Sequence, residues 1–95
     1  MHIINRTNIG NASVGTTSIE ITAANEARKW IVICNPSDTG VYLNFGAAAE
    51  ASKGIYLGAR GGVLSYTEGD VHISLAVYAI TASGSGKTIT YLEGL

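Results

Sequence analysis

Apolar and polar residues alternate along much of this chain with the two-residue period of a β-strand. The alternation is strict in residues 18–22, where Ile19 and Ile21 share one face and Glu20 points to solvent. Shorter or longer stretches with the same pattern are residues 41–45, 55–57, 63–66 and 87–93. Each of these stretches predicts a strand with one buried face.

Residues 29–35 are apolar on both faces. Trp30, Val32 and Cys34 fall on one face, and Ile31 and Ile33 on the other. This pattern predicts a central strand that is covered on both sides, with Cys34 as a small buried hydrophobe. The next residues, 35–40, are all of turn-forming types, so we expect strands 29–35 and 41–45 to form a hairpin.

Residues 71–82 alternate over an unusual length and predict one long strand with a bulge or bend near Ser74. Residues 83–86, Ser-Gly-Ser-Gly, predict a flexible hairpin turn before the closing strand. Helix signals are confined to residues 23–27 and 46–51, which are too short for more than a turn.

Seven or eight short strands spaced by roughly 8–12 residues are typical of an all-β fold, an antiparallel β-sandwich or a jelly-roll-like form of it. The 95 residues make one domain, which we place at residues 16–95. Residues 1–15 are either an N-terminal arm that orders on a neighbouring subunit or a plain first strand, and the pattern leaves both open.

Charge is scarce. Charged residues make up 14% of the chain, against about 25% in an average soluble domain. Scattered charges of both signs normally keep monomers apart, so their scarcity favours association with other subunits. With a net charge of −1 and no basic cluster, we expect neither nucleic acid nor a membrane surface as a partner. The N-terminus lacks the apolar stretch of a secretion signal, which predicts synthesis in a cytoplasm.

Residues 84–88, Gly-Ser-Gly-Lys-Thr, resemble the end of a phosphate-binding P-loop. The full motif requires a glycine at position 81, where this chain has Thr81. The residues that follow predict a strand, whereas a P-loop opens a helix. We therefore expect a turn here, with Lys87 protecting a strand edge.

Asp70 and His72 share a strand face and could form part of a hydrolase triad, but the chain has no Gly-x-Ser-x-Gly nucleophile motif. Its two histidines, His2 and His72, are too few for a zinc site. We expect no catalytic, cofactor-binding or metal site, and we do not expect an enzyme.

The candidate functional residues are therefore those of an interface. Tyrosine combines a large apolar body with a polar tip and is common at protein interfaces. Our candidates are Ile3, Ile4, Tyr42, Tyr56, Tyr66 and Tyr78. Because tyrosines on a sheet face also bind sugars, a carbohydrate-binding module is an alternative.

Four segments carry a resemblance to a known class of proteins. They are residues 23–29 leading into the apolar strand that ends at Asn35, residues 41–46 (Val-Tyr-Leu-Asn-Phe-Gly), residues 54–57 (Gly-Ile-Tyr-Leu) and residues 77–86. In this order they resemble small β-sandwich structural proteins of tailed bacteriophages, over roughly residues 14–93. Such domains serve as capsid decoration (cement) proteins, head-fibre bases or tail components.

The resemblance implies a virion structural protein, made in the host cytoplasm and carried on the capsid surface. Our leading expectation is a decoration protein that binds the outside of a phage head, as a homotrimer, and bridges subunits of the major capsid protein. A ligand that binds only the assembled shell stabilises it by mass action. A tail or fibre module of the same virion is the alternative.

Overall fold

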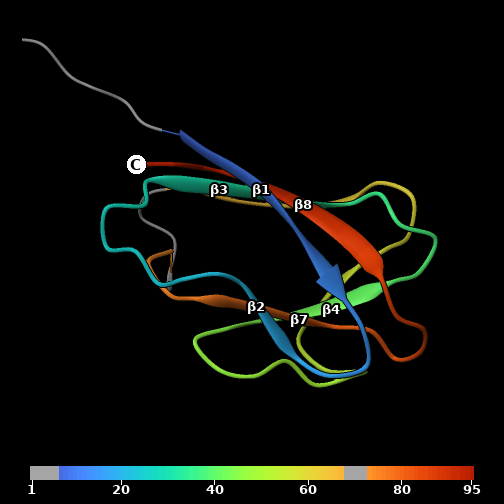
Figure 1. The fold of residues 1–95 in the computed structure, drawn as a ribbon. Helices are drawn as coiled ribbons and strands as arrows, with labels where there is room; N and C mark the ends of the chain where they lie inside the picture. The colour runs from blue at the N-terminus through green and yellow to red at the C-terminus, as the bar shows by residue number, and fades with distance from the viewer. Residues whose placement is uncertain (1–6, 68–72) are drawn as a thin grey trace, which may run out of the picture.

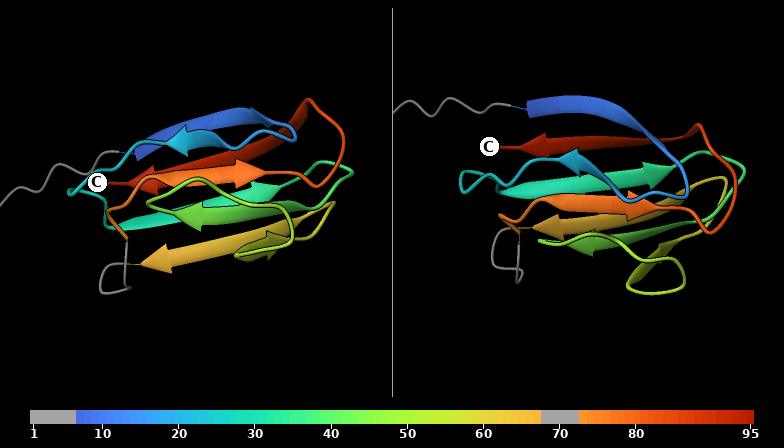
Figure 2. Two further views of the ribbon diagram at one scale, coloured as in Figure 1. Left: turned by 90° about the horizontal axis from the view of Figure 1, so that it is seen from below. Right: turned by 60° about the horizontal axis from the view of Figure 1, so that its bottom comes forward.

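The computed structural model describes residues 7–67 and 73–95, which fold into two four-stranded antiparallel sheets packed face to face (Figures 1 and 2). The strands are β1 (Thr7–Val14), β2 (Ile19–Thr22), β3 (Trp30–Asn35), β4 (Val41–Phe45), β5 (Ile55–Leu57), β6 (Gly62–Thr67), β7 (Val77–Ile80) and β8 (Lys87–Gly94). The described residues contain no helix. The predicted all-β sandwich is confirmed.

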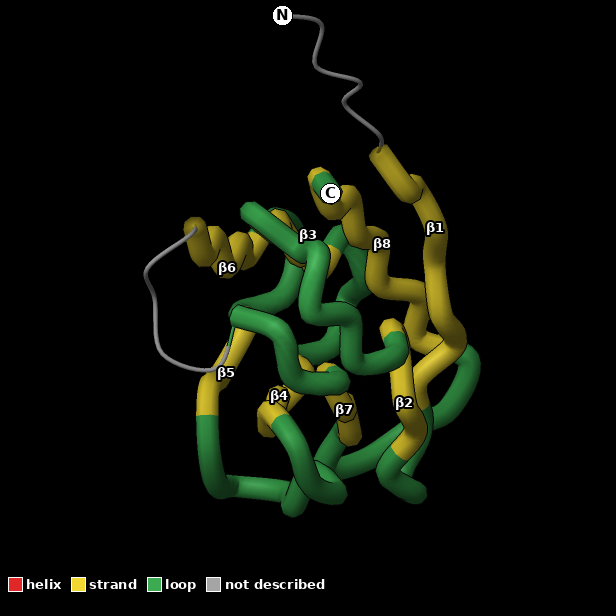
Figure 3. Tube along the Cα trace, turned by 90° about the vertical axis from the view of Figure 1, so that its left-hand side faces the viewer, coloured by secondary structure: helices red, strands yellow, loops and turns green. Residues whose placement is uncertain are grey.

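The strand order is nested. Sheet A has the order β1-β8-β3-β6 and sheet B the order β2-β7-β4-β5. The first strand pairs with the last, β1 with β8. Moving inward along the chain, β2 pairs with β7, β3 with β6 and β4 with β5. The two layers are seen end-on in Figure 3. Of the connections between successive strands, only the one from β4 to β5 stays within a sheet.

This topology corrects two predicted hairpins. Strand β3 lies in sheet A and β4 in sheet B, so residues 36–40 connect the two layers. Residues 81–86 likewise connect β7 in sheet B to β8 in sheet A. Turn-forming residues reverse the chain, but they do not determine whether the two strands pair side by side or pack face to face. Lys87 is not at an edge either, because β8 lies between β1 and β3.

The predicted long strand over residues 71–82 is wrong in extent. Residues 71 and 72 lie outside the described residues. From residue 73 on, strand β7 covers only Val77–Ile80, and residues 73–75 form a turn and a bend. The backbone carbonyls of Ile73 and Leu75 accept hydrogen bonds from the Arg28 side chain instead of joining a sheet. Val77 and Ala79 are fully buried, so this face of β7 points into the core.

The core lies between the sheets and is built from inward-facing residues of seven of the described strands, with the partly buried Leu64 and Tyr66 of β6 packed against it. Its buried members are Val14, Ile21, Ile31, Ile33, Val41, Leu43, Leu57, Val77, Ala79 and Ile89. Full burial of an aliphatic side chain of this size contributes about 1.5–3 kcal/mol. The alternation seen in the sequence therefore places the apolar side chains of both sheets in the space between them, where their burial holds the sheets together.

Of the two alternatives for residues 1–15, the structure places residues 7–14 in a strand. Strand β1 pairs with β8 over its whole length, from Thr7 opposite Gly94 to Val14 opposite Lys87. The two interface candidates Ile3 and Ile4 lie outside the described residues.

Candidate functional site

On the outer surface of sheet A, the described strands carry no charged side chain. We call its outward-pointing residues the uncharged face. They are Thr7, Ile9, Asn11 and Ser13 of β1, Thr88, Thr90 and Leu92 of β8, Trp30, Val32 and Cys34 of β3, and Val63, Ser65 and Thr67 of β6. Ile9 is 84% exposed, Val63 59% and Leu92 36%. Aliphatic side chains in open solvent on a four-stranded sheet make this the first candidate binding surface.

Apolar residues run from the edge of this face to its centre. Ile9 lies opposite Leu92, and Leu92 lies opposite Val32. Trp30 lies across Gly94 of β8, so closely that a β-carbon at Gly94 would overlap the indole. The indole is therefore packed against the backbone of β8 at this end of the face.

The uncharged face corrects the prediction that strand 29–35 is covered on both sides. Strand β3 is central in sheet A and its inward residues Ile31 and Ile33 are fully buried. Its outward residues, including Cys34, are only partly buried. Apolar residues on both faces predict a strand that needs two covering layers, but the described part of the chain provides only the one on the inner side.

The outer surface of sheet B brings three of the candidate tyrosines together. Tyr42 and Tyr56 are opposite each other on β4 and β5, with ring centroids 5.1 Å apart and planes tilted by 49°. The Tyr56 ring lies against the backbone at Gly40 and is 57% exposed. On the next strand, the Tyr78 hydroxyl donates to Glu20 Oε2 at 3.3 Å. We call Tyr42, Tyr56 and Tyr78 the tyrosine face.

Tyr66 is not part of either outer surface. It lies opposite Ile31 on the inner side of sheet A and stacks on Phe45 of sheet B, with ring centroids 5.1 Å apart and planes 26° from parallel. The pair packs against the core between the two sheets.

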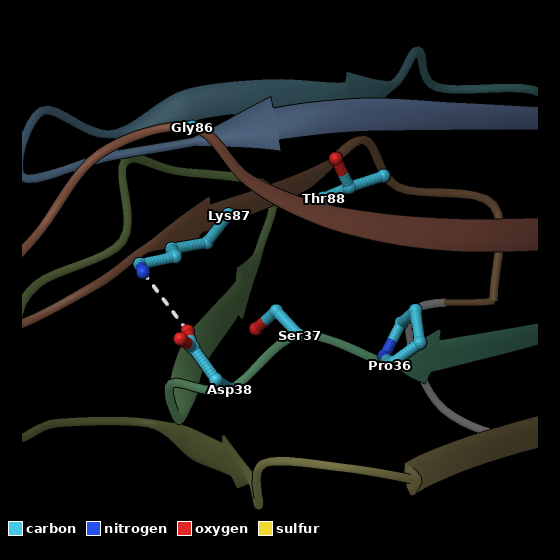
Figure 4. A pocket seen from close by; sticks show the side chains of 6 residues that line it. All are labelled: Pro36, Ser37, Asp38, Gly86, Lys87 and Thr88. Carbon is cyan, nitrogen blue, oxygen red and sulfur yellow. Dashed lines mark hydrogen bonds and ion pairs between the residues drawn. The ribbon is translucent and has the colours of Figure 1, made fainter.

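The P-loop-like segment lines an open hollow of about 350 Å³ between residues 36–38 and 86–88 (Figure 4). Lys87 Nζ donates to Asp38 Oδ1 at 2.9 Å. That hydrogen bond, a second one from Thr39 and the Lys87 charge lower the pKa of the Asp38 carboxyl below its ordinary value of 3.8. As predicted, residues from Lys87 onward form a strand. The Lys87 side chain forms an ion pair with Asp38, which joins the start of β8 to the connection between β3 and β4.

One buried polar cluster was missed in the sequence. Arg28 and Glu93 are only 2% and 4% exposed, and Arg28 Nε donates to Glu93 Oε2 at 2.6 Å. The rest of the guanidinium donates to the carbonyls of Ile73, Leu75 and Ala23 and to the Thr22 hydroxyl, at 2.7–3.3 Å. Because Glu93 belongs to sheet A and Thr22 to sheet B, the cluster ties the two layers together.

A sequence signal existed for one member of this pair. Glu93 continues the inward alternation of Ile89 and Tyr91, which predicts a buried carboxylate that needs a partner. Arg28 lies in a connection before β3, where no periodicity indicates its burial.

Within residues 7–67 and 73–95, no three His, Cys, Asp or Glu side chains gather in a way that could hold a metal ion, and no helix is long and apolar enough to cross a membrane. Asp70 and His72 lie outside the described residues. Comparison of the chain with protein-family models, with curated proteins and with solved structures finds no match. The two open sheet faces are therefore the features from which a function can be argued.

Proposed function

We propose that this chain is a virion structural protein of a tailed bacteriophage, a capsid decoration protein that binds the outside of the head and bridges subunits of the major capsid protein. The observation that carries the proposal is the uncharged face. The resemblance noted in the sequence supplies the biological setting.

An uncharged, partly apolar sheet suits docking on another protein. Its residues lose no charge–water interactions when they are covered, and burial of exposed aliphatic area contributes about 25 cal/mol per Å² before the cost of association. A shell with many equivalent sites gains this binding free energy at each of them, which stabilises the assembled shell against its free subunits.

The nested strand order is a second support. We infer that the sandwich is of the jelly-roll form, because a ribbon of paired strands folded over itself gives this order in two sheets. Jelly rolls occur in viral capsid and lectin domains. This support is an analogy at the level of the fold, since one fold hosts many functions.

The test uses phage particles that lack this chain. Purified protein should bind their heads, raise the temperature at which the heads release DNA, and give density on the outer surface of the shell in a reconstruction. Leu92→Glu puts a charge on the uncharged face and should abolish binding, whereas Ala51→Glu, in an exposed loop, should not. Density on the tail would instead support a tail or fibre module, and absence from the particle would overturn both.

The tyrosine face supports a second candidate, a carbohydrate-binding module. Paired rings such as Tyr42 and Tyr56 offer an apolar surface on which a sugar ring can stack. A glycan array probed with the protein should then give binding that is lost in Tyr56→Ala. An array without signal would dispose of this candidate and leave the first unaffected.

A further inference from the structure

Strand β1 is an open edge of sheet A. In the strand order of this sheet its one neighbour is β8 (Figure 3). An edge strand presents backbone N–H and C=O groups that can pair with another chain, and natural proteins usually guard such edges with charges, prolines or short length. β1 has eight residues, Thr-Asn-Ile-Gly-Asn-Ala-Ser-Val, and none of them is charged or proline.

The other described edges are better protected or shorter. Strand β5 has three residues, and β2 has four and carries Glu20. The opposite edge of sheet A, β6, has six residues. β1 is thus the longest of these edges.

Ile9 adds an independent observation. It projects from this edge strand with 84% of its surface exposed, at the outer end of the apolar row that continues through Leu92 to Val32. An aliphatic side chain so exposed at the edge has neighbours on one side alone. A strand added beside β1 would supply neighbours on the other side.

We propose that two copies of this chain pair antiparallel along β1, about a two-fold axis, and join their A sheets into one continuous eight-stranded sheet. In such an isologous contact the strand must be complementary to itself. An uncharged strand meets this condition, because pairing with its own copy brings no like charges together. A strand bearing lysines or glutamates would place like charges opposite each other.

The pleat limits the possible registers. Outward residues must stand opposite outward residues if the two sheets are to continue each other. In every such register Ile9 stands opposite Thr7, Ile9, Asn11 or Ser13 of the second copy, and the two uncharged faces merge into one face of twice the width. This two-fold pairing differs from the three-fold arrangement that the resemblance implies, and it does not depend on attachment to a phage head.

The contact is small. Eight residues at about 3.4 Å each give an edge of about 27 Å, which places the contact among weak and reversible interfaces. We expect a monomer–dimer equilibrium in which the mass rises with concentration from 9.8 kDa toward twice that value.

The test is sedimentation of the full chain over concentrations from about 1 µM to about 1 mM. Ile9→Lys places a charge from each copy within the proposed contact and should keep the protein monomeric throughout. Val63→Lys is the matched control, because Val63 is also an exposed aliphatic residue of the uncharged face but lies on the opposite edge of the sheet. It should dimerise as the unsubstituted chain does.

Hydrogen exchange gives a second measurement that needs no variant. The β1 amides that point away from β8 should become protected as concentration rises, while the β6 amides that point away from β3 should not. A monomer at all concentrations, a trimer, or equal loss of association in both lysine variants would overturn the pairing. A monomer that still binds phage heads would overturn it and leave the proposed function intact.

Discussion

Arg28 forms a complete set of hydrogen bonds in a site with almost no access to water. Its Nε, Nη1 and Nη2 groups all have acceptors, and Glu93 also accepts a hydrogen bond from the Asn8 side chain at 3.2 Å. Buried ions are tolerated in proteins only when they are paired and hydrogen-bonded in this way. The cluster is therefore sensitive to the loss of either partner.

We expect Arg28→Met and Glu93→Leu each to lower the free energy of unfolding by about 3–5 kcal/mol, because each leaves a buried charge without its partner. The double variant should lose less than the sum of the two, since no charge then remains. Urea unfolding measures all three. Lys53→Met is the control: Lys53 pairs with Glu50 on the surface, where both side chains are about 70% exposed, and the change should stay below about 1 kcal/mol. Additive losses would contradict this account.

Asp38 predicts a dependence of stability on pH. Its pKa in the folded protein is lowered by the Lys87 hydrogen bond, the Thr39 hydrogen bond and the Lys87 charge. A lowered pKa means that the carboxylate adds stability above the unfolded value, and that this contribution is lost as pH falls through the folded value. The difference in unfolding free energy between the unsubstituted chain and Asp38→Asn should thus be present at pH 7 and vanish in strong acid. In a Lys87→Met background, the difference between chains with and without Asp38→Asn should be small at both pH values. If the difference in the unsubstituted background were the same in acid and at pH 7, this would count against the ion pair.

At the scale of the element, strand β8 and the indole above it depend on each other. Trp30 lies on the backbone of Gly94, where a β-carbon would overlap the ring. Gly94→Ala should displace the indole into solvent, shift the emission of this single tryptophan to the red and cost about 1–3 kcal/mol. Gly58→Ala is the control, because a β-carbon there meets only the Tyr56 ring at an ordinary 3.9 Å. An unchanged spectrum in Gly94→Ala would show that the indole does not rest on this glycine.

Individual strands were predictable, but their partners were not. The alternation of Ile19 and Ile21 and that of Val41 and Leu43 identified β2 and β4, since period alone decides which residues face a core. Whether β3 and β4 hydrogen-bond in one sheet or pack face to face in two sheets depends on the pairing of β3 with β6 and β8, which lie far along the chain. The early end of β7 depends on the Arg28 guanidinium, which no local pattern reveals.

The candidate surfaces were predictable in part. The two-residue period places Tyr42, Tyr56 and Tyr78 on the face of their strand that points away from the core. Only the strand order shows that the three lie on the same sheet. The same period left Tyr66 on the inner face with Ile31, where it stacks on Phe45. The low charge of the chain indicated an uncharged surface. Its location could not be predicted, because the sequence does not show that the described residues cover sheet A on one side alone.

At the scale of the whole molecule, Cys34 is a probe of the uncharged face. It is partly exposed near the middle of that face, between Thr90 of β8 and Val63 of β6. A thiol reagent should label it in the free protein and label it much more slowly in protein bound to a phage head. A Cys34→Ser variant that carries Ser85→Cys in an exposed loop should be labelled equally in both states. Unchanged labelling of Cys34 would mean that another surface docks.

The nested pairing of strands also sets an order of events for the chain as it is made. Strands β4 and β5, joined by residues 46–54, are the sole pair that successive segments can form; β3 with β6, β2 with β7 and β1 with β8 each close a longer loop. Loop closure becomes less favourable with length, so the ribbon should zip outward from its middle, with β1 and β8 joining last. A chain synthesised only as far as β7 would then lack β8, the strand that lies between β1 and β3. The uncharged face would be assembled only once Gly94 has been made, so a chain that stops short of β8 could not bind a partner through this face.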